Sequence, residues 1–189
     1  IEKLAQPKLA ISLTDFDTNP MQLCVGNGVI DLETGKLMSP VPSMHHSKMT
    51  GVEHEARATC PRFMQFLADI FPDDMELVAY VQKVAGYLLT GSTKEQSLFM
   101  LLGGGANGKS TLVNLLIDLL GDYAANTAAS TLMASNSNQY GDDLIRLAGA
   151  RLITSSETEH GQRFAEAKIK SFTGGDKVTG RPLYGSWVE

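Results

Sequence analysis

Hydrophobic and polar positions follow different patterns in successive parts of the chain. Residues 23–38 hold short apolar runs broken by the turn signals Asn27-Gly28 and Glu33-Thr34-Gly35, a pattern typical of strands joined by turns. From residue 60 onward, apolar residues recur at steps of three and four, which indicates helices. We therefore expect a small N-terminal domain over residues 1–92, mixed but mainly helical.

Two helices are expected in the second half of this domain. The first covers residues 60–71 and is interrupted by Pro72. Asp73 and Glu76 resemble a capping box that opens the second helix. That helix has one apolar face and should end at Thr90-Gly91-Ser92.

A strand, a loop and a helix then follow in that order. Residues 97–102 form a short apolar run suited to a buried parallel strand. Leucines recur at helical spacing over residues 112–120, and Gly121 ends this pattern. Residues 123–141 show only a weak pattern, from which we expect helix fragments and loop. The order predicts an α/β domain over residues 93–189.

The loop between strand and helix, residues 103–110, fits the phosphate-binding pattern GxxxxGK(S/T). At average residue frequencies, a chance match in a chain of this length has a probability of about 0.006. Backbone amides at the start of the helix would hold the β- and γ-phosphates, and Lys109 would place a cation over them. Ser110 would supply a hydroxyl ligand to Mg²⁺. We therefore expect ATP and Mg²⁺ as cofactors. The candidate nucleotide-binding residues are Gly103, Gly104, Gly105, Ala106, Asn107, Gly108, Lys109, Ser110 and Thr111.

Such a loop needs a second, acidic site to hold the metal and to orient the attacking water. Residues 152–156 should form a short core strand beside the strand that feeds the loop, which puts Glu157 at its carboxyl end. Glu157 would bind Mg²⁺ together with Ser110, and Glu157 or Glu159 would polarise the water. The alternative is that both acids lie in a surface turn. With Lys109, these two glutamates are the candidate catalytic residues.

Composition adds few constraints. Hydrophobic residues make up 43% and charged residues 20%, with a net charge of −5, as is ordinary for a globular protein. No apolar run approaches the roughly 18 residues that a membrane span needs, and no signal peptide is visible. Cys24 and Cys60 lack metal-ligand spacing, so we expect reduced thiols in a reducing compartment. No acid or thiol completes a metal site with the adjacent His45 and His46, so we expect both on a loop surface.

Basic residues concentrate near the end of the chain. Residues 163–181 hold five basic side chains against two acidic ones, although the whole chain is acidic. Binding of nucleic-acid phosphates depends on such local clusters rather than on total charge. A solvated helix face would show the same composition. Because the chain starts at Ile1 and stops at Glu189 within an apolar and aromatic stretch, we also expect it to be an internal fragment.

The motifs together resemble the helicase portion of phage and plasmid primase-helicases, a group related to the poxvirus primase-helicase and classed with the superfamily 3 helicases. The resemblance covers nearly everything from Asp15 onward. The segments that carry it are residues 27–35, 86–93, 105–111, 149–152, 156–159 and 170–176.

The resemblance implies a P-loop NTPase core with an AAA+-like fold, which assembles into a hexameric ring and moves along single-stranded or forked DNA. It implies that Lys170, Lys177 and Arg181 contact DNA in the ring channel. A sensor asparagine and an arginine finger would follow Glu189, and a primase region would lie on the same full-length chain. The expected location is the cytoplasm of a bacterial host.

Two other function classes stay open at this stage. A small-molecule kinase shares the phosphate loop, but it usually carries an arginine-bearing lid, and no arginine lies within the 30 residues that follow Lys109. The chain could also be an interaction module that binds a nucleotide without turnover. A guanine-specific switch is disfavoured because no Asn-Lys-x-Asp sequence follows the loop.

Overall fold

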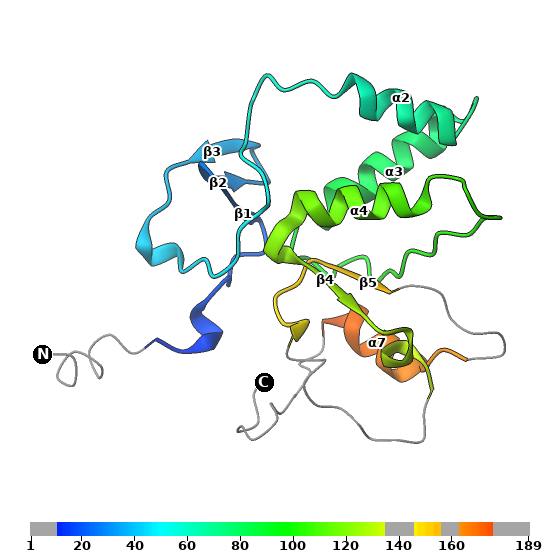
Figure 1. Ribbon diagram of the computed structural model, residues 1–189. Helices are drawn as coiled ribbons and strands as arrows, with labels where there is room; N and C mark the ends of the chain where they lie inside the picture. The colour runs from blue at the N-terminus through cyan, green and yellow to red at the C-terminus, as the bar shows by residue number, and fades with distance from the viewer. Residues whose placement is uncertain (1–10, 135–145, 156–162, 176–189) are drawn as a thin grey trace, which may run out of the picture.

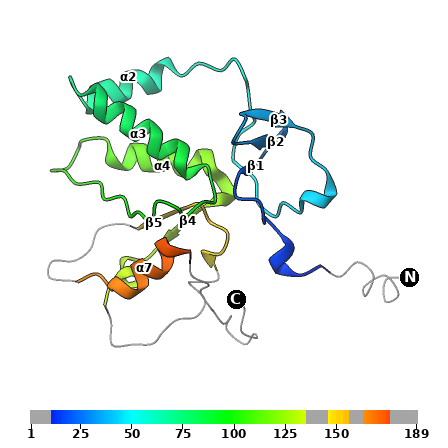
Figure 2. The ribbon, with the colours of Figure 1, turned by 180° about the vertical axis from the view of Figure 1, so that it is seen from behind.

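The computed structural model describes residues 11–134, 146–155 and 163–175. Figures 1 and 2 show a small sheet from the N-terminal residues beside a group of helices. They also show two further strands that lie between the helix of residues 109–120 and the helix of residues 166–174. The strands are β1 (Gln22–Val25), β2 (Gly28–Asp31), β3 (Lys36–Met38), β4 (Ala124–Thr127) and β5 (Leu152–Ser155). The helices are α2 (Pro61–Ile70), α3 (Met75–Leu88), α4 (Lys109–Leu120), α5 (Ala129–Leu132) and α7 (Glu166–Gly174). Three short 3₁₀ helices are η1 (Leu13–Asp15), η2 (Pro42–Met44) and η3 (Gly121–Tyr123).

The first three strands form an antiparallel sheet in the order β1-β2-β3, as the alternation of residues 23–38 predicts. The turn between β2 and β3 is built on Asp31, whose Oδ1 accepts hydrogen bonds from the amides of Glu33 (2.9 Å) and Thr34 (3.0 Å). These bonds, that from Thr34 foremost, lower the pKa of the Asp31 carboxyl.

Both expected helices of the N-terminal part are present, but the capping residue of the second is different. Asp74, not Asp73, is the N-cap of α3, and its Oδ1 accepts from the amide of Leu77 at 2.9 Å. Asp73 instead takes a positive φ of 59° in the tight turn after α2. With Asp74 as the N-cap, Glu76 is the second residue of the helix and Leu77 the third. The predicted capping box, which needs its glutamate at the third position, is therefore not formed.

The hydrophobic core consists of two clusters that α4 connects. One cluster contains Leu67 of α2, Val78 of α3 and Leu112 near the start of α4. The other contains Leu23 and Val25 of β1 together with Leu120 at the far end of α4 and Tyr123 of η3. Each cluster therefore contains residues from both expected domains, before and after position 92. The boundary between the two expected domains stays a prediction.

The strand expected over residues 97–102 is not formed. No described strand pairs with this segment, and four of its apolar side chains are exposed, Leu102 to 81%. The expected strand at residue 152 is confirmed as β5, but its parallel neighbour is β4. The segment of β4 reads Ala-Ala-Asn-Thr, and backbone pairing with β5 rather than an apolar pattern makes it a strand.

Candidate functional site

The glycine-rich loop of residues 103–108 leads directly into α4. Gly108 is the N-cap of this helix, with a φ of 80°. A Cβ added to Gly108 would lie 2.7 Å from Cγ2 of Ile70 and 3.2 Å from the ring of Phe66. The loop thus approaches α2 so closely that only glycine fits at position 108.

The start of α4 presents a row of unpaired backbone donors. The first bond of the helix runs from the amide of Leu112 to the carbonyl of Gly108, at 2.9 Å. Among the described residues, the amides of positions 106–111 have no hydrogen-bond acceptor. Ser110 and Thr111 are also exposed. Free amides at the positive end of a helix favour an anion such as phosphate, so the local geometry suits the predicted ligand.

Lys109 folds back over the loop. Its Nζ donates to the carbonyl oxygen of Gly103 at 2.9 Å and to Oδ1 of Asn107 at 2.7 Å. The ammonium therefore lies against the loop that is expected to hold phosphates. Gly104, Gly105 and Ala106 complete the exposed turn between them.

The two parallel strands run toward the side of the molecule at which α4 begins (Figure 1). The carboxyl end of β5 at Ser155 therefore faces the same side as the loop. Glu157 and Glu159 lie outside the described residues, so their role in metal binding and water activation stays a prediction. The described part of the chain holds no cluster of three or more His, Cys, Asp or Glu side chains that could bind a metal by itself.

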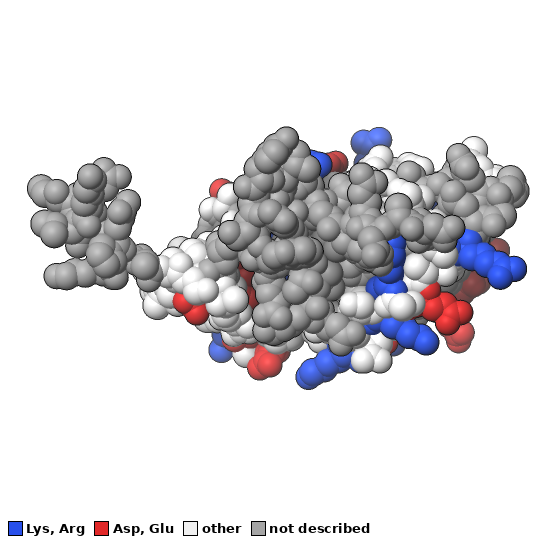
Figure 3. Space-filling view, turned by 90° about the horizontal axis from the view of Figure 1, so that it is seen from below, with Lys and Arg blue, Asp and Glu red and all other residues white. Residues whose placement is uncertain are grey.

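The basic segment is described only as far as α7. Nζ of Lys170 lies 3.9 Å from Oε2 of Glu166 in the preceding turn, and both side chains are more than three-quarters exposed. Lys168 donates to the carbonyl of Met133 at 3.5 Å. Figure 3 shows Lys and Arg side chains interspersed with Asp and Glu on the described part of this face. Lys177 and Arg181 lie outside the described residues.

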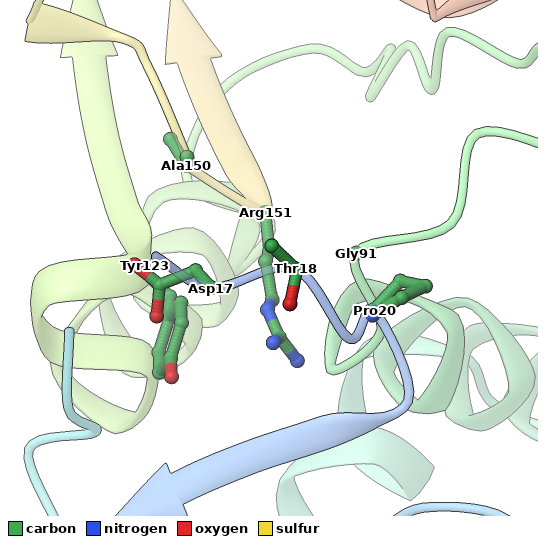
Figure 4. A pocket seen from close by; sticks show the side chains of 8 residues that line it. Asp17, Thr18, Pro20, Gly91, Tyr123, Ala150 and Arg151 are labelled. Carbon is green, nitrogen blue, oxygen red and sulfur yellow. The ribbon is translucent and has the colours of Figure 1, made fainter. Parts of the chain in front are cut away.

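One pocket of about 340 Å³ lies at the other end of α4. Because α4 has 12 residues, its two ends are about 18 Å apart, so this pocket is separate from the phosphate loop. Figure 4 shows Arg151 reaching into it between Tyr123 on one side and Thr18 on the other. The guanidinium lies 4.4 Å from the centre of the Tyr123 ring.

Arg151 joins segments that are far apart in the sequence. Its Nη2 donates to the carbonyl of Gln22 in β1 at 2.5 Å, and its Nη1 donates to the carbonyl of Leu89, just after α3. Burial lowers the pKa of Arg151, and burial raises that of Tyr123. Position 151 belongs to a segment that carries the family resemblance. Nothing in the sequence, however, predicts that the side chain of Arg151, which directly precedes β5, donates hydrogen bonds to β1 and to the end of α3.

His46 also departs from expectation. Its side chain is only 9% exposed, and its Nδ1 lies 3.7 Å from Oδ1 of Asp17. Asp17 in turn accepts from the amide and the hydroxyl of Ser47. Both histidines lie on a loop, as expected, but only His45 is exposed, whereas the side chain of His46 is largely covered beside Asp17.

The chain is similar to several known proteins. Residues 1–72 match the protein family described as D5 N terminal like. The chain is 32% identical over 178 residues to "Putative helicase L207/L206" of Acanthamoeba polyphaga mimivirus, with 91% of this chain and 18% of that protein covered. It is 28% identical to "Putative primase C962R" of African swine fever virus, with 89% and 18% covered. For "Putative helicase 121R" of Invertebrate iridescent virus 3 the identity is 25%, with 89% and 19% covered.

The chain is related to viral proteins named as primases and helicases. Because these similarities cover about nine-tenths of the chain, they extend past residue 72 and include the glycine-rich loop. The chain spans less than a fifth of the length of these curated relatives. A phage or plasmid origin stays a prediction. In the described part of the chain, no helix combines the length and the apolar character that crossing a membrane requires.

Proposed function

We propose that this chain is the nucleotide-binding part of an ATP-dependent DNA helicase, within a larger primase-helicase. The observation that carries the proposal is the loop at residues 103–110, where amides without acceptors lie at the start of α4 and the ammonium of Lys109 folds back to Gly103. Supporting it, the relatives are named as helicases or primases.

In this proposal the fold is a P-loop NTPase core of the AAA+-like, superfamily 3 type. The amides of the loop and Lys109 bind the β- and γ-phosphates of ATP, and Ser110 binds Mg²⁺. Glu157 completes the metal site, and Glu157 or Glu159 polarises the water that attacks the γ-phosphate. Single-stranded DNA passes over Lys170, Lys177 and Arg181, in a ring of identical subunits.

The first test is Lys109→Ala in the full-length protein, with ATP affinity and Mg²⁺-dependent hydrolysis measured with and without single-stranded DNA. Loss of the cation over the phosphates should weaken ATP binding and abolish turnover. Lys36→Ala removes an exposed lysine on β3 and is the charge-matched control. Turnover of Lys109→Ala within a few-fold of the control would reject the assignment of the loop.

The acidic segment has its own test. Glu157→Gln should keep ATP binding and remove most turnover, because the amide keeps the shape but loses the charge that serves the metal and the water. Glu159→Gln should act in the same way. If neither change slows hydrolysis, the acidic residues of the site lie elsewhere in the chain.

The DNA contacts are tested by the double variant Lys177→Ala with Arg181→Ala. Affinity for single-stranded DNA should fall about equally across sequences, and its salt dependence should flatten by roughly two phosphate contacts. ATP affinity should be unchanged. An unchanged salt slope would show that these residues do not contact DNA. Production of a phosphorylated small molecule, instead of DNA-stimulated hydrolysis, would favour a kinase.

A further inference from the structure

Asn107 lies within the phosphate loop but has no fixed role in the GxxxxGK(S/T) pattern. Its side chain reaches over the loop to Gly103. A Cβ placed on Gly103 would lie 2.0 Å from Nδ2 of Asn107, so the amide occupies the space directly against that glycine. Any side chain at position 103 would displace it.

The other end of the same amide holds the loop lysine. Oδ1 of Asn107 accepts a hydrogen bond from Nζ of Lys109 at 2.7 Å, the shorter of the two bonds that this ammonium makes. A bond of this length with a charged donor is among the stronger neutral-acceptor contacts in proteins. Lys109 is half-buried, whereas Asn107 is exposed.

The ammonium cannot keep both of these bonds and also point all its protons at a triphosphate. An ammonium has three donors, and in the described structure two are given to the loop itself. Binding of the β- and γ-phosphates therefore competes with the contact between Lys109 and Asn107. The neutral amide oxygen is the weaker competitor, since a phosphate oxygen carries charge.

We propose that Asn107 is a positioning residue that restrains Lys109 against the loop and must release it when a nucleoside triphosphate binds. This inference rests on the proposed function and deepens it. The restraint makes Asn107 unfavourable for triphosphate affinity, while it keeps the ammonium close to the phosphate site.

Two substitutions at position 107 should therefore act in opposite directions. Asn107→Ala removes the competing acceptor, so the affinity for Mg²⁺–ATP should rise by about fivefold. Asn107→Asp adds a carboxylate that pairs with Lys109 and repels the phosphates, so the affinity should fall by at least about tenfold. Asn114→Ala, at an exposed asparagine in the second turn of α4, is the matched control and should leave the affinity for Mg²⁺–ATP unchanged.

Further measurements separate this restraint from a general effect on folding. The affinity for AMP should be unchanged in both variants, since Lys109 acts on the outer phosphates. The loss in Asn107→Asp should shrink as the pH is lowered toward the pKa of the new carboxyl, whereas Asn107→Ala should show no such dependence. In a Lys109→Ala background, Asn107→Ala should have no effect on ATP affinity.

The measurement is equilibrium binding of Mg²⁺–ATP and of AMP to the full-length protein. Weaker or unchanged ATP binding by Asn107→Ala would overturn the restraint, because it would mean that the amide contacts the nucleotide or does not hold the lysine. The proposed function would still stand if Lys109→Ala weakened ATP binding. If Lys109→Ala left ATP binding unchanged, the proposed function itself would fail, whatever the variants at position 107 did.

Discussion

Gly108→Ala should be among the most damaging single-methyl changes in this chain. The residue has a φ of 80°, and an added Cβ would lie 2.7 Å from Cγ2 of Ile70 and 3.2 Å from two ring carbons of Phe66. Two separate costs therefore arise from one methyl group: the left-handed backbone conformation, and the overlap with α2.

The magnitude follows from these two terms. A left-handed conformation costs a residue with a Cβ about 1–2 kcal/mol. Forcing an extra methyl group into packed side chains costs about 1–3 kcal/mol, and Ile70 is a branched side chain on a helix that cannot simply swing away. The free energy of unfolding should thus fall by about 2–5 kcal/mol.

Two other glycines of the same loop separate the terms. Gly105 has a φ of 68° but nothing within 4 Å of an added Cβ, so Gly105→Ala carries the backbone cost alone. Gly104 has neither a positive φ nor a close neighbour. Each Gly→Ala change also reduces the conformational entropy of the unfolded chain, which by itself stabilises the folded protein by about 0.4–1 kcal/mol. Because this contribution is the same for all three variants, it cancels when they are compared.

The assay is urea unfolding of the chain followed by far-ultraviolet circular dichroism. The expected order of destabilisation is Gly108→Ala first, then Gly105→Ala, then Gly104→Ala with little or no loss. If Gly108→Ala were no worse than Gly105→Ala, the contact between the loop and α2 would not exist as described.

Three further changes test other parts of the molecule by the same unfolding assay. Arg151→Lys should lower the free energy of unfolding by about 1–3 kcal/mol, because lysine cannot donate to both carbonyl oxygens while it stacks on the Tyr123 ring. A loss below about 0.3 kcal/mol would show that these contacts of Arg151 do not stabilise the fold. Leu120→Ala, at a fully buried position, should lower the free energy of unfolding by about 2–5 kcal/mol. Leu102→Ala, at a side chain that is 81% exposed, should change it by no more than about 0.5 kcal/mol. Equal effects of the two changes would contradict the described core. The native pKa of Asp31 is lowered, so its carboxylate adds stability above its ordinary pKa of about 4 and loses it as the pH falls through the lower native value. Asp31→Asn should flatten this part of the pH profile, and an unchanged acid limb would count against the turn geometry.

Local interactions explain the features that could be predicted from the sequence. Gly108 and Gly121 bracket α4 because helix ends depend on residues within one turn. The turn around Asp31 follows from one side chain and the amides two and three positions after it. The loop between residues 103 and 110 is likewise a local pattern, which is why its chemistry could be inferred before its geometry.

The misjudged features depend on partners far away in the chain. The apolar residues 97–102 carry the pattern of a strand, but a strand exists only when another segment offers it hydrogen bonds, and no described strand does so. The segment of β4 has almost no apolar pattern and is nevertheless a strand, since β5 pairs with all four of its residues.

What the sequence by itself determined is therefore the start and end of α4 and the turns of the first sheet, all set by residues within a few positions of one another. Tertiary structure alone decided that β4 pairs with β5, that His46 is buried beside Asp17, and that Arg151 binds carbonyls 62 and 129 positions away. The physical reason is range. Capping, turn formation and backbone conformation are short-range effects that the order of residues records directly, whereas pairing, burial and buried charge depend on which distant segments meet when the chain folds.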